Sequence, residues 1–106
     1  MVYSLFIDDE RFPVDDKAII VRSVEAAIAY VRENGAPRHV SFDNDLGPGK
    51  REGWEFARWL IEYDLDLRRL PEDFTFSVHS QNCVRGPYIE GTLNRYLCDR
   101  QSDFTD

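Results

Sequence analysis

The sequence predicts one α/β domain built on an open, mostly parallel sheet of about four strands. Short runs rich in valine, isoleucine and phenylalanine alternate with segments whose apolar residues recur at helical spacing. Strands that alternate with helices in this way usually pair in parallel through right-handed crossovers. In addition, three of the runs end in acidic or polar clusters, as expected where ligands bind at the carboxyl edge of such a sheet.

The first half of the chain contains three of the expected strands and the first helix. The strands are expected at residues 2–7, 18–21 and 40–42. Ser23 is placed to cap the start of the helix, because it directly precedes an alanine-rich segment. Asn34-Gly35 ends that segment. The link between the first two strands contains Phe12-Pro13 and is too short and proline-broken to hold a good helix. This is unusual for a doubly wound fold.

The second half is expected to contain two more helices and the fourth strand. One helix begins near Gly53, and its apolar residues fall at helical spacing, at Trp54, Ala57, Leu60 and Ile61. Residues 64–71 either continue this helix or form a connector, and Pro71 closes the segment. The fourth strand is expected at residues 74–78.

The C-terminal part of the chain is expected to form a helix followed by a tail. The helix would run from about Pro87 or Tyr88 to Leu97, with the proline in its first turn. Residues 99–106 are polar and are expected to form a loose tail. Residues 1–98 would then form a single α/β domain, since no repeat or linker divides them.

Composition limits the possible partners. The chain has 106 residues, enough for one core and too few for two. Its net charge of −7 argues against an extended nucleic-acid surface, because phosphate backbones bind to basic protein surface. No apolar run approaches the ~20 residues that cross a bilayer, and the N-terminus lacks signal-peptide features. With only two cysteines and no metal-site spacing, we expect a reduced, cytoplasmic setting. The oligomeric state is left open.

The strongest functional signal lies at the ends of three strands. The residues there are Asp8 and Asp9 after the first strand, Asp43 and Asp45 after the third, and His79, Ser80 and Asn82 after the fourth. If the sheet is parallel, these ends emerge at one edge and converge on one site.

Carboxylates that converge at one edge repel each other, and a hard divalent cation relieves that repulsion. Carboxylate and carbonyl oxygens suit Mg²⁺ or Mn²⁺. We therefore expect Asp8, Asp9 and one of Asp43 or Asp45 to bind such a metal ion. Mg²⁺ often accepts phosphate oxygens as further ligands, so the expected substrate is a phosphorylated small molecule, a nucleotide or an RNA end.

The remaining polar residues would then act on the phosphate. Arg11, Ser80 and Asn82 are expected to donate hydrogen bonds to its oxygens. A carboxylate that the metal does not use would serve as nucleophile or general base. His79 is a candidate general acid, because its ordinary pKa lies near neutrality.

Each of these residues also has a purely structural interpretation. Asp8-Asp9 could form an Asx turn or a helix cap, and the loop that begins at Asp43 could be ordinary turn chemistry. His79 alternates with Val78 and could be a satisfied histidine in a core face. Arg11 could simply neutralise one of the aspartates. The coincidence of acidic pairs at two strand ends favours the functional interpretation.

The order of these residues resembles that of the receiver domain of two-component response regulators, a flavodoxin-like fold. In that family an acidic pair after the first strand and an aspartate after the third hold Mg²⁺, and the latter aspartate accepts a phosphoryl group. A hydroxyl residue after the fourth strand contacts that group. The resemblance places Asp8 and Asp9 in the pair and Ser80 in the hydroxyl position.

The phosphoacceptor position has two candidates. Strand register favours Asp43, whereas the distance to Gly53 suits Asp45, and we prefer Asp43 as the strand-end residue. The chain also departs from a receiver. The first helix is reduced to the Phe12-Pro13 loop, and no fifth strand with the receiver's phosphate-binding lysine is expected.

Three motifs are more similar to the cyclic-phosphate processing receiver-like family. Its Asp-Asp-x-Arg signature matches residues 8–11, its Asp-x-Asp-Leu-Gly signature residues 43–47, and its His-Ser-x-Asn signature residues 79–82. The similarity extends to about Leu97. It implies a truncated, receiver-like domain that hydrolyses nucleotide or RNA cyclic phosphates.

The leading hypothesis is thus a phosphoesterase dependent on Mg²⁺ or Mn²⁺ that opens a cyclic phosphate, such as the 2′,3′-cyclic phosphate left by RNA cleavage. Asp8, Asp9 and Asp43 would hold the metal, and Asp43 or Asp45 would act as nucleophile or activate water. His79 would protonate the leaving oxygen. The alternatives are a phosphoacceptor domain in a signalling relay and a non-catalytic protein that binds a nucleotide or a partner.

Overall fold

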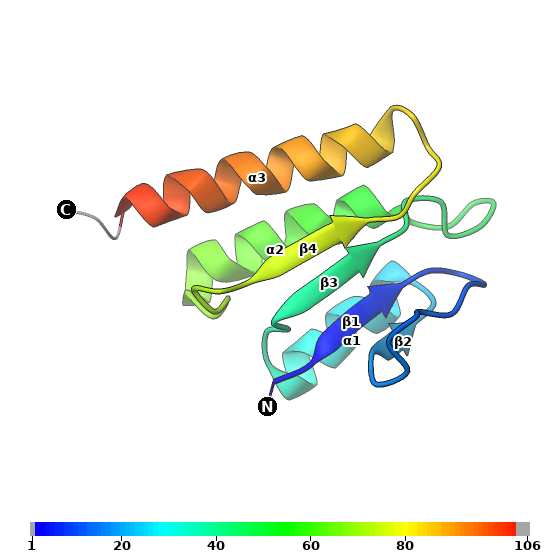
Figure 1. Ribbon diagram of the computed structural model, residues 1–106, viewed down its shortest axis with the longest axis horizontal. Coiled ribbons are helices and arrows are strands. Elements are labelled where there is room, and N and C mark those ends of the chain that lie inside the picture. The colour runs from blue at the N-terminus through cyan, green and yellow to red at the C-terminus, as the bar shows by residue number, and fades with distance from the viewer. Residues whose placement is uncertain (1, 104–106) are drawn as a thin grey trace.

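A computed structural model describes residues 2–103 of the chain (Figure 1). The strands are β1 (Ser4–Ile7), β2 (Ile19–Val21), β3 (His39–Phe42) and β4 (Thr75–Val78), and the helices are α1 (Val24–Asn34), α2 (Gly53–Leu67) and α3 (Arg85–Asp103). The strands form one sheet in the order β2-β1-β3-β4, and every neighbouring pair is parallel. The predicted α/β fold with about four parallel strands is confirmed.

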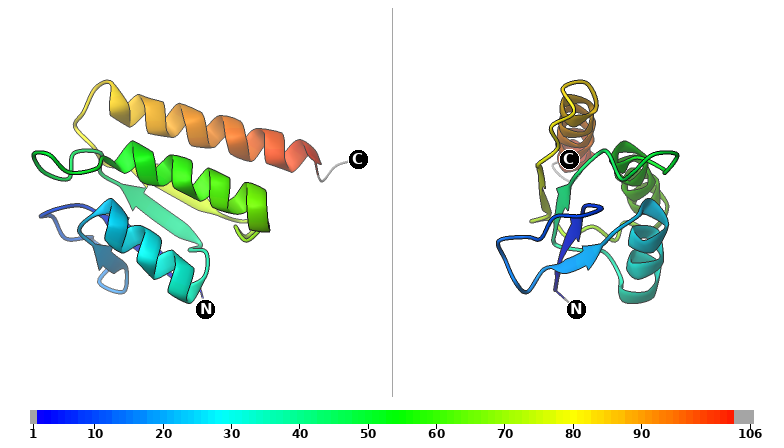
Figure 2. Two further views of the ribbon diagram at one scale, coloured as in Figure 1. Left: turned by 180° about the vertical axis from the view of Figure 1, so that it is seen from behind. Right: turned by 90° about the vertical axis from the view of Figure 1, so that its right-hand side faces the viewer.

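The described helices lie on one side of the sheet. Helices α1 and α2 cover one face, and α3 packs against α2 and the edge strand β4 (Figures 1 and 2). The loop from β1 to β2 projects on the opposite side, as the right-hand view of Figure 2 shows. As predicted, this connection contains no helix.

The core fills the space between the sheet and the helices. Successive side chains of a strand alternate between its two faces, so every second residue points toward the helices. The largest fully buried side chains are Phe42, Phe56, Leu5, Ile7, Leu60, Ile89 and Leu93. They come from the sheet and from helices α2 and α3, which therefore hold one continuous core.

The other side of the sheet, which we call the open face, carries a different set of side chains. Its members are Ser4 and Phe6 of β1, Ile20 of β2, His39 and Ser41 of β3, and Thr75 and Ser77 of β4. Thr75 and Ser77 are exposed and Ser41 is half-buried. Beyond the strand ends, Asp8, Asp43 and His79 continue the same alternation.

Helix α1 begins and ends as the sequence predicts. The Ser23 side chain accepts a hydrogen bond from the backbone N–H of Ala26 at 3.1 Å. At the other end Gly35 has φ +91°, a conformation that glycine adopts without the strain of a side chain. The N–H of Gly35 donates to the carbonyl of Val31, which satisfies one of the last helical carbonyls.

Of the two interpretations of residues 64–71, helical continuation is confirmed as far as Leu67. Arg68 then ends α2 in the left-handed conformation, with φ 51°. Asp64, in the last turn, is fully buried. Its Oδ1 accepts a hydrogen bond from the N–H of Leu70 at 2.9 Å, so the carboxylate stabilises the turn after the helix.

The predicted end of the last helix is wrong. Helix α3 begins at Arg85 and continues past Leu97 to Asp103, so residues 99–103 are helical and not a loose tail. Arg100 explains the extension: it is 8% exposed, and its Nε donates to Oδ2 of Asp64 at 2.5 Å. The tail residues 104–106 lie outside the described residues. Along residues 2–103, no helix combines the length and the apolar character needed to cross a bilayer.

Candidate functional site

The strand register brings the three predicted strand ends together. Ile7, Phe42 and Val78 are direct neighbours across β1, β3 and β4. The hydrogen bonding continues one residue further, because the N–H of Asp43 donates to Ile7 and the N–H of His79 donates to Phe42, both at 2.9 Å. Asp8, Asp43 and His79 therefore leave the sheet side by side, as the parallel sheet predicts.

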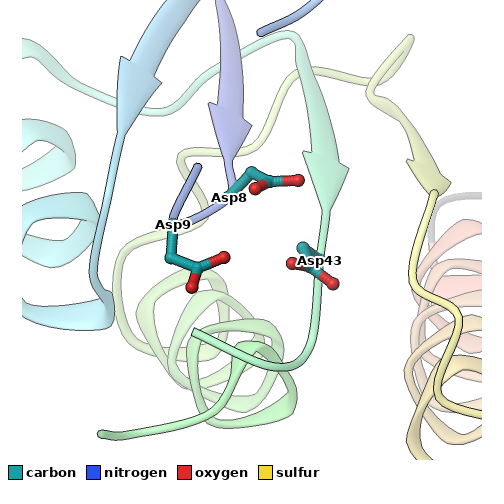
Figure 3. Close-up of side chains that lie close together, drawn as sticks. All are labelled: Asp8, Asp9 and Asp43. Carbon is teal, nitrogen blue, oxygen red and sulfur yellow. The ribbon is translucent and has the colours of Figure 1, made fainter. Parts of the chain in front are cut away.

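Three carboxylates converge at this edge. Asp8, Asp9 and Asp43 each offer one oxygen, and these oxygens lie within 4.8 Å of one another. Figure 3 shows the side chains pointing toward the space between the ends of β1 and β3. We call these three residues the acidic cluster. Two of its members, Asp8 and Asp43, are buried, so water offsets their mutual repulsion poorly.

Asp8 is fully buried and strongly hydrogen-bonded. Its Oδ1 accepts from the backbone N–H groups of Glu10 and Arg11, both at 2.9 Å, so Asp8 does form the Asx turn of the structural interpretation. Its Oδ2 lies 2.9 Å from Nε2 of His79. Burial alone would raise the pKa of Asp8, but the hydrogen bonds from Arg11, Glu10 and His79 outweigh it and lower the pKa. The carboxylate is thus held ionised and oriented.

Asp43 is in the opposite electrostatic situation. It is 7% exposed, and burial followed by the neighbouring Asp8 carboxylate raises its pKa above the ordinary range. An ionised Asp43 is therefore costly in the protein alone. A divalent cation among the three carboxylates would remove that cost by supplying positive charge at short range.

Asp45 lies apart from the acidic cluster. It is exposed, and its Oδ1 accepts a hydrogen bond from Nδ2 of Asn82 at 3.3 Å. Among the described residues the cluster includes Asp43 and not Asp45. Asp45 nevertheless lines a pocket that opens beside the cluster.

A pocket of about 630 Å³ opens beside the cluster, and we call it the acidic pocket. The acidic residues that line it are Asp9, Glu10, Asp43, Asp45 and Glu52. The basic residues that line it are Arg11 and Lys50. With this excess of carboxylates an anionic phosphate is repelled unless a cation binds first, whereas Arg11 and Lys50 are placed to meet its outer oxygens.

Residues at the start of helix α2 hold the segment that contains Asp43 in place. Asn44 is fully buried; its Oδ1 accepts from the N–H of Trp54 at 3.1 Å and its Nδ2 donates to Glu52 at 2.8 Å. At Gly53 a Cβ atom would lie 2.0 Å from the carbonyl oxygen of Asp43, so only glycine fits. Asn44 was not predicted as a site residue. Its position two residues after Phe42, on the side of the sheet that faces the helices, could have indicated a buried amide.

His79 lies on the open face and not in the core. Its ring stacks on Phe6 with centroids 4.7 Å apart, and its side chain is 22% exposed. Both ring nitrogens have partners: Nε2 contacts Asp8, and Nδ1 lies 2.7 Å from Oγ of Ser41. In this arrangement His79 orients Asp8 and Ser41 orients His79, a role of Ser41 that no sequence pattern indicated.

The predicted phosphate-binding residues lie in two different parts of the structure. Arg11 lines the acidic pocket and its Nη1 donates to the carbonyl of His79 at 3.3 Å. Ser80 and Asn82 form the turn before α3, where Ser80 Oγ accepts from the N–H of Asn82 at 3.1 Å. The residue between them, Gln81, lines the pocket instead.

Arg22 fixes the loop that carries Arg11, a role that no sequence pattern indicated. Its Nη1 donates to the carbonyl oxygens of Asp8 at 3.0 Å and Arg11 at 2.6 Å. Its guanidinium also lies 4.9 Å from the centroid of the Phe12 ring. These contacts anchor residues 8–12 at the end of β1.

Comparison with known proteins agrees with this geometry. The family model described as cyclic-phosphate processing receiver domain matches residues 3–95, which include all three strand ends. Neither a curated protein nor a solved structure matches the chain significantly. The four-stranded parallel sheet and its helices are consistent with a receiver-like fold. The chain therefore belongs to the cyclic-phosphate processing receiver domain family.

Proposed function

We propose that the chain is a phosphoesterase, dependent on a divalent metal ion, that opens a nucleotide or RNA-terminal cyclic phosphate. One observation carries the proposal: three carboxylates, two of them buried, converge at the wall of a pocket whose charged lining residues are mostly acidic. Such a cluster favours a hard cation, and a cation there would attract phosphate. The family name supports a role in cyclic-phosphate processing.

The donor set fits Mg²⁺ or Mn²⁺. Asp8, Asp9 and Asp43 supply carboxylate oxygens, and Oδ2 of Asp8 keeps a lone pair after its hydrogen bond with His79. When bound, a divalent ion would polarise a phosphoryl oxygen and offset the charge that develops on it. The hydrogen bonds to Asp8 would hold the ligand in place, as partners of metal ligands commonly do.

The reaction adds water to phosphorus and breaks one ring P–O bond, and the released ribose oxygen takes a proton. Asp45 is our candidate for the base that removes the proton from water, because it lines the pocket but lies outside the acidic cluster. Asp43, as a nucleophile, is the alternative. Arg11 would bind the non-bridging oxygens, and Ser80 and Asn82 would position the turn that carries Gln81.

His79 remains our candidate for the general acid, but one of its present hydrogen bonds would first have to break. Both of its ring nitrogens have partners, Asp8 and Ser41. To protonate the leaving oxygen, His79 would have to exchange one of these partners for the substrate. Until then its role is to hold the Asp8 carboxylate in place.

The test is turnover of 2′,3′-cyclic nucleotides with Mg²⁺ or Mn²⁺, compared with the same reaction in excess chelator. We expect Asp43→Asn to lower kcat/KM by about 100-fold or more, since it removes a proposed metal ligand. Asp66→Asn is a matched control, because Asp66 is an exposed aspartate of α2. A wild-type rate equal to the uncatalysed background, or full activity in Asp43→Asn, would overturn the proposal. A stable phosphoryl group on Asp43 after treatment with acetyl phosphate would favour a phosphoacceptor instead.

A further inference from the structure

The acidic pocket lies between two loops that project past the carboxyl ends of the strands (Figure 1). The loop after β1 contributes residues 9–11 to its lining, and the loop after β3 contributes residues 45–50. Each loop supplies one of the two basic residues of the lining, Arg11 and Lys50. A ligand that enters the pocket therefore meets one cationic side chain from each loop.

The protein holds these two cations in different ways. Nη1 of Arg11 donates to the carbonyl of His79 at 3.3 Å, and Arg22 fixes the carbonyl of Arg11 at 2.6 Å. Lys50 is exposed, and within residues 2–103 its ammonium forms no ion pair or hydrogen bond, although five carboxylates line the same pocket. All three of its N–H donors are thus available to a ligand.

The backbone that carries Lys50 is fixed at both ends. Before it, Leu46 is 5% exposed and belongs to the core. The N–H of Lys50 donates to the carbonyl of Gly47 at 3.1 Å, which closes a turn. After it, the N–H of Glu52 donates to Oε2 of Glu55 at 2.8 Å, where helix α2 begins. Little backbone freedom is consequently lost when Lys50 binds a ligand.

Gly47 makes room for the stem of Lys50. Its φ is +120°, a conformation that residues with a side chain rarely adopt. A Cβ atom at this position would lie 3.3 Å from Cγ of Lys50, which is tighter than nearly all such contacts. The Lys50 stem therefore packs against the backbone of Gly47, and a side chain there would push it aside.

The charges of the pocket show why such a cation is needed. Three carboxylates carry more negative charge than one divalent ion neutralises, so the acidic cluster stays anionic with a metal ion bound. Glu10, Asp45 and Glu52 add further carboxylates to the lining. Nε of Arg11 lies 3.9 Å from Oδ2 of Asp8, so part of its charge is already offset. Lys50 is the lining cation whose charge no carboxylate of the described chain offsets at short range.

We propose that Lys50 is a substrate-binding residue that sets the affinity of the acidic pocket for phosphate, and that Gly47 positions it. The inference rests on the proposed function in one respect, namely that the substrate phosphate lies in this pocket. The ammonium donates to a non-bridging oxygen that the metal ion does not bind. This contact forms with substrate and transition state alike, so it lowers KM and leaves kcat nearly unchanged.

Lys50→Met tests the charge, because methionine keeps most of the apolar stem and removes the ammonium. We expect it to raise KM for a 2′,3′-cyclic nucleotide by about 10-fold, the value of one charged hydrogen bond, with little change in kcat. Lys50→Arg should restore most of the affinity. Lys17→Met is the matched control, because Lys17 is the other lysine of the chain, is exposed and does not line the acidic pocket. A fall in kcat with an unchanged KM would contradict the binding role.

Gly47→Ala tests the positioning of the stem. It should raise KM by about 3-fold in the wild-type background and have little effect in the Lys50→Met background, since its effect passes through Lys50. Equal effects of Gly47→Ala in the two backgrounds would show that Gly47 does not position Lys50.

Binding without turnover separates this inference from the proposed function. In calorimetric titrations with inorganic phosphate and Mn²⁺, we expect wild type to bind phosphate about 10-fold more tightly than Lys50→Met. The difference should shrink at an ionic strength of about 1 M, where screening acts within about 3 Å. Absent turnover together with this difference in affinity would refute the enzyme and support the role of Lys50. Equal KM values, or equal phosphate binding by the two proteins, would overturn that role while leaving the phosphoesterase intact.

Discussion

Asp43 has a less favourable ionised state than its neighbour Asp8. Burial and the Asp8 carboxylate raise its pKa, whereas hydrogen bonds lower the pKa of Asp8 despite its burial. The two residues thus have different tasks. Asp8 is a carboxylate fixed in place by the backbone and His79, and Asp43 is the carboxylate whose ionised form needs a nearby cation.

The raised pKa of Asp43 makes a specific prediction for the metal-free protein. A carboxyl whose pKa is higher in the folded state binds more protons there, so it destabilises the protein as pH rises through its folded pKa. Asparagine imitates the neutral form. In chelator, we expect Asp43→Asn to be more stable than wild type near neutral pH, by about 1.4 kcal/mol for each unit by which the pKa is raised.

This difference should shrink as pH falls to the ordinary aspartate range, because wild-type Asp43 then becomes protonated too. Thermal unfolding of both proteins from about pH 4 to pH 8 measures it. Asp8 acts with the opposite sign, since its lowered pKa stabilises the protein above its ordinary range, and it is present in both proteins. A variant that is less stable than wild type at every pH would contradict this electrostatic account.

At the scale of elements, the end of α2 and the end of α3 are joined by a buried polar network. Oδ2 of Asp64 accepts from Tyr96 at 2.7 Å and from Arg100 at 2.5 Å, and Nη2 of Arg100 donates to the carbonyl of Leu70 at 2.7 Å. Asp64 is fully buried and Arg100 nearly so. A buried charge pair of this kind is costly to break from one side.

We expect Asp64→Ala to lower the free energy of unfolding by about 3–5 kcal/mol, since it leaves the Arg100 guanidinium buried without its carboxylate. Asp66→Ala, two residues along the same helix and exposed, should change it by less than about 0.5 kcal/mol. Denaturant unfolding measures both. Equal losses in the two variants would show that the network does not hold α3 in place.

For the molecule as a whole, the sequence predicted those features that follow from local pattern. Short apolar runs define the strands, and the carboxyl ends of parallel strands bring Asp8, Asp43 and His79 together. The end of α3 was missed because Arg100 pairs with Asp64, and a contact across 36 positions leaves no trace in a local pattern. Strand register favoured Asp43 over Asp45 as the strand-end residue, but the reactive carboxylate was left open, because alternation gives both the same side and only the turn after the strand parts them.

The role of Ser41 was missed, and the orientation of His79 was left open, for a different reason. A doubly wound fold has helices on both faces of its sheet, and there a histidine next to Val78 would be a core residue. Here the described helices lie on one side, and the opposite face carries serines, histidines and a cavity. Which face of the sheet the helices cover depends on the packing of the whole molecule and not on a local sequence pattern.

Binding of a divalent cation by Asp8, Asp9 and Asp43 can be measured through the melting temperature with Mn²⁺ and with chelator. A ligand at about 100 times its Kd stabilises the folded state by about 2.7 kcal/mol, which raises the Tm of a domain of this size by about 10 °C or more. We expect that rise in wild type and in Asp66→Asn, and little or none in Asp43→Asn. An unchanged wild-type Tm in saturating Mn²⁺, or the same rise in Asp43→Asn, would show that these three carboxylates do not form a metal site.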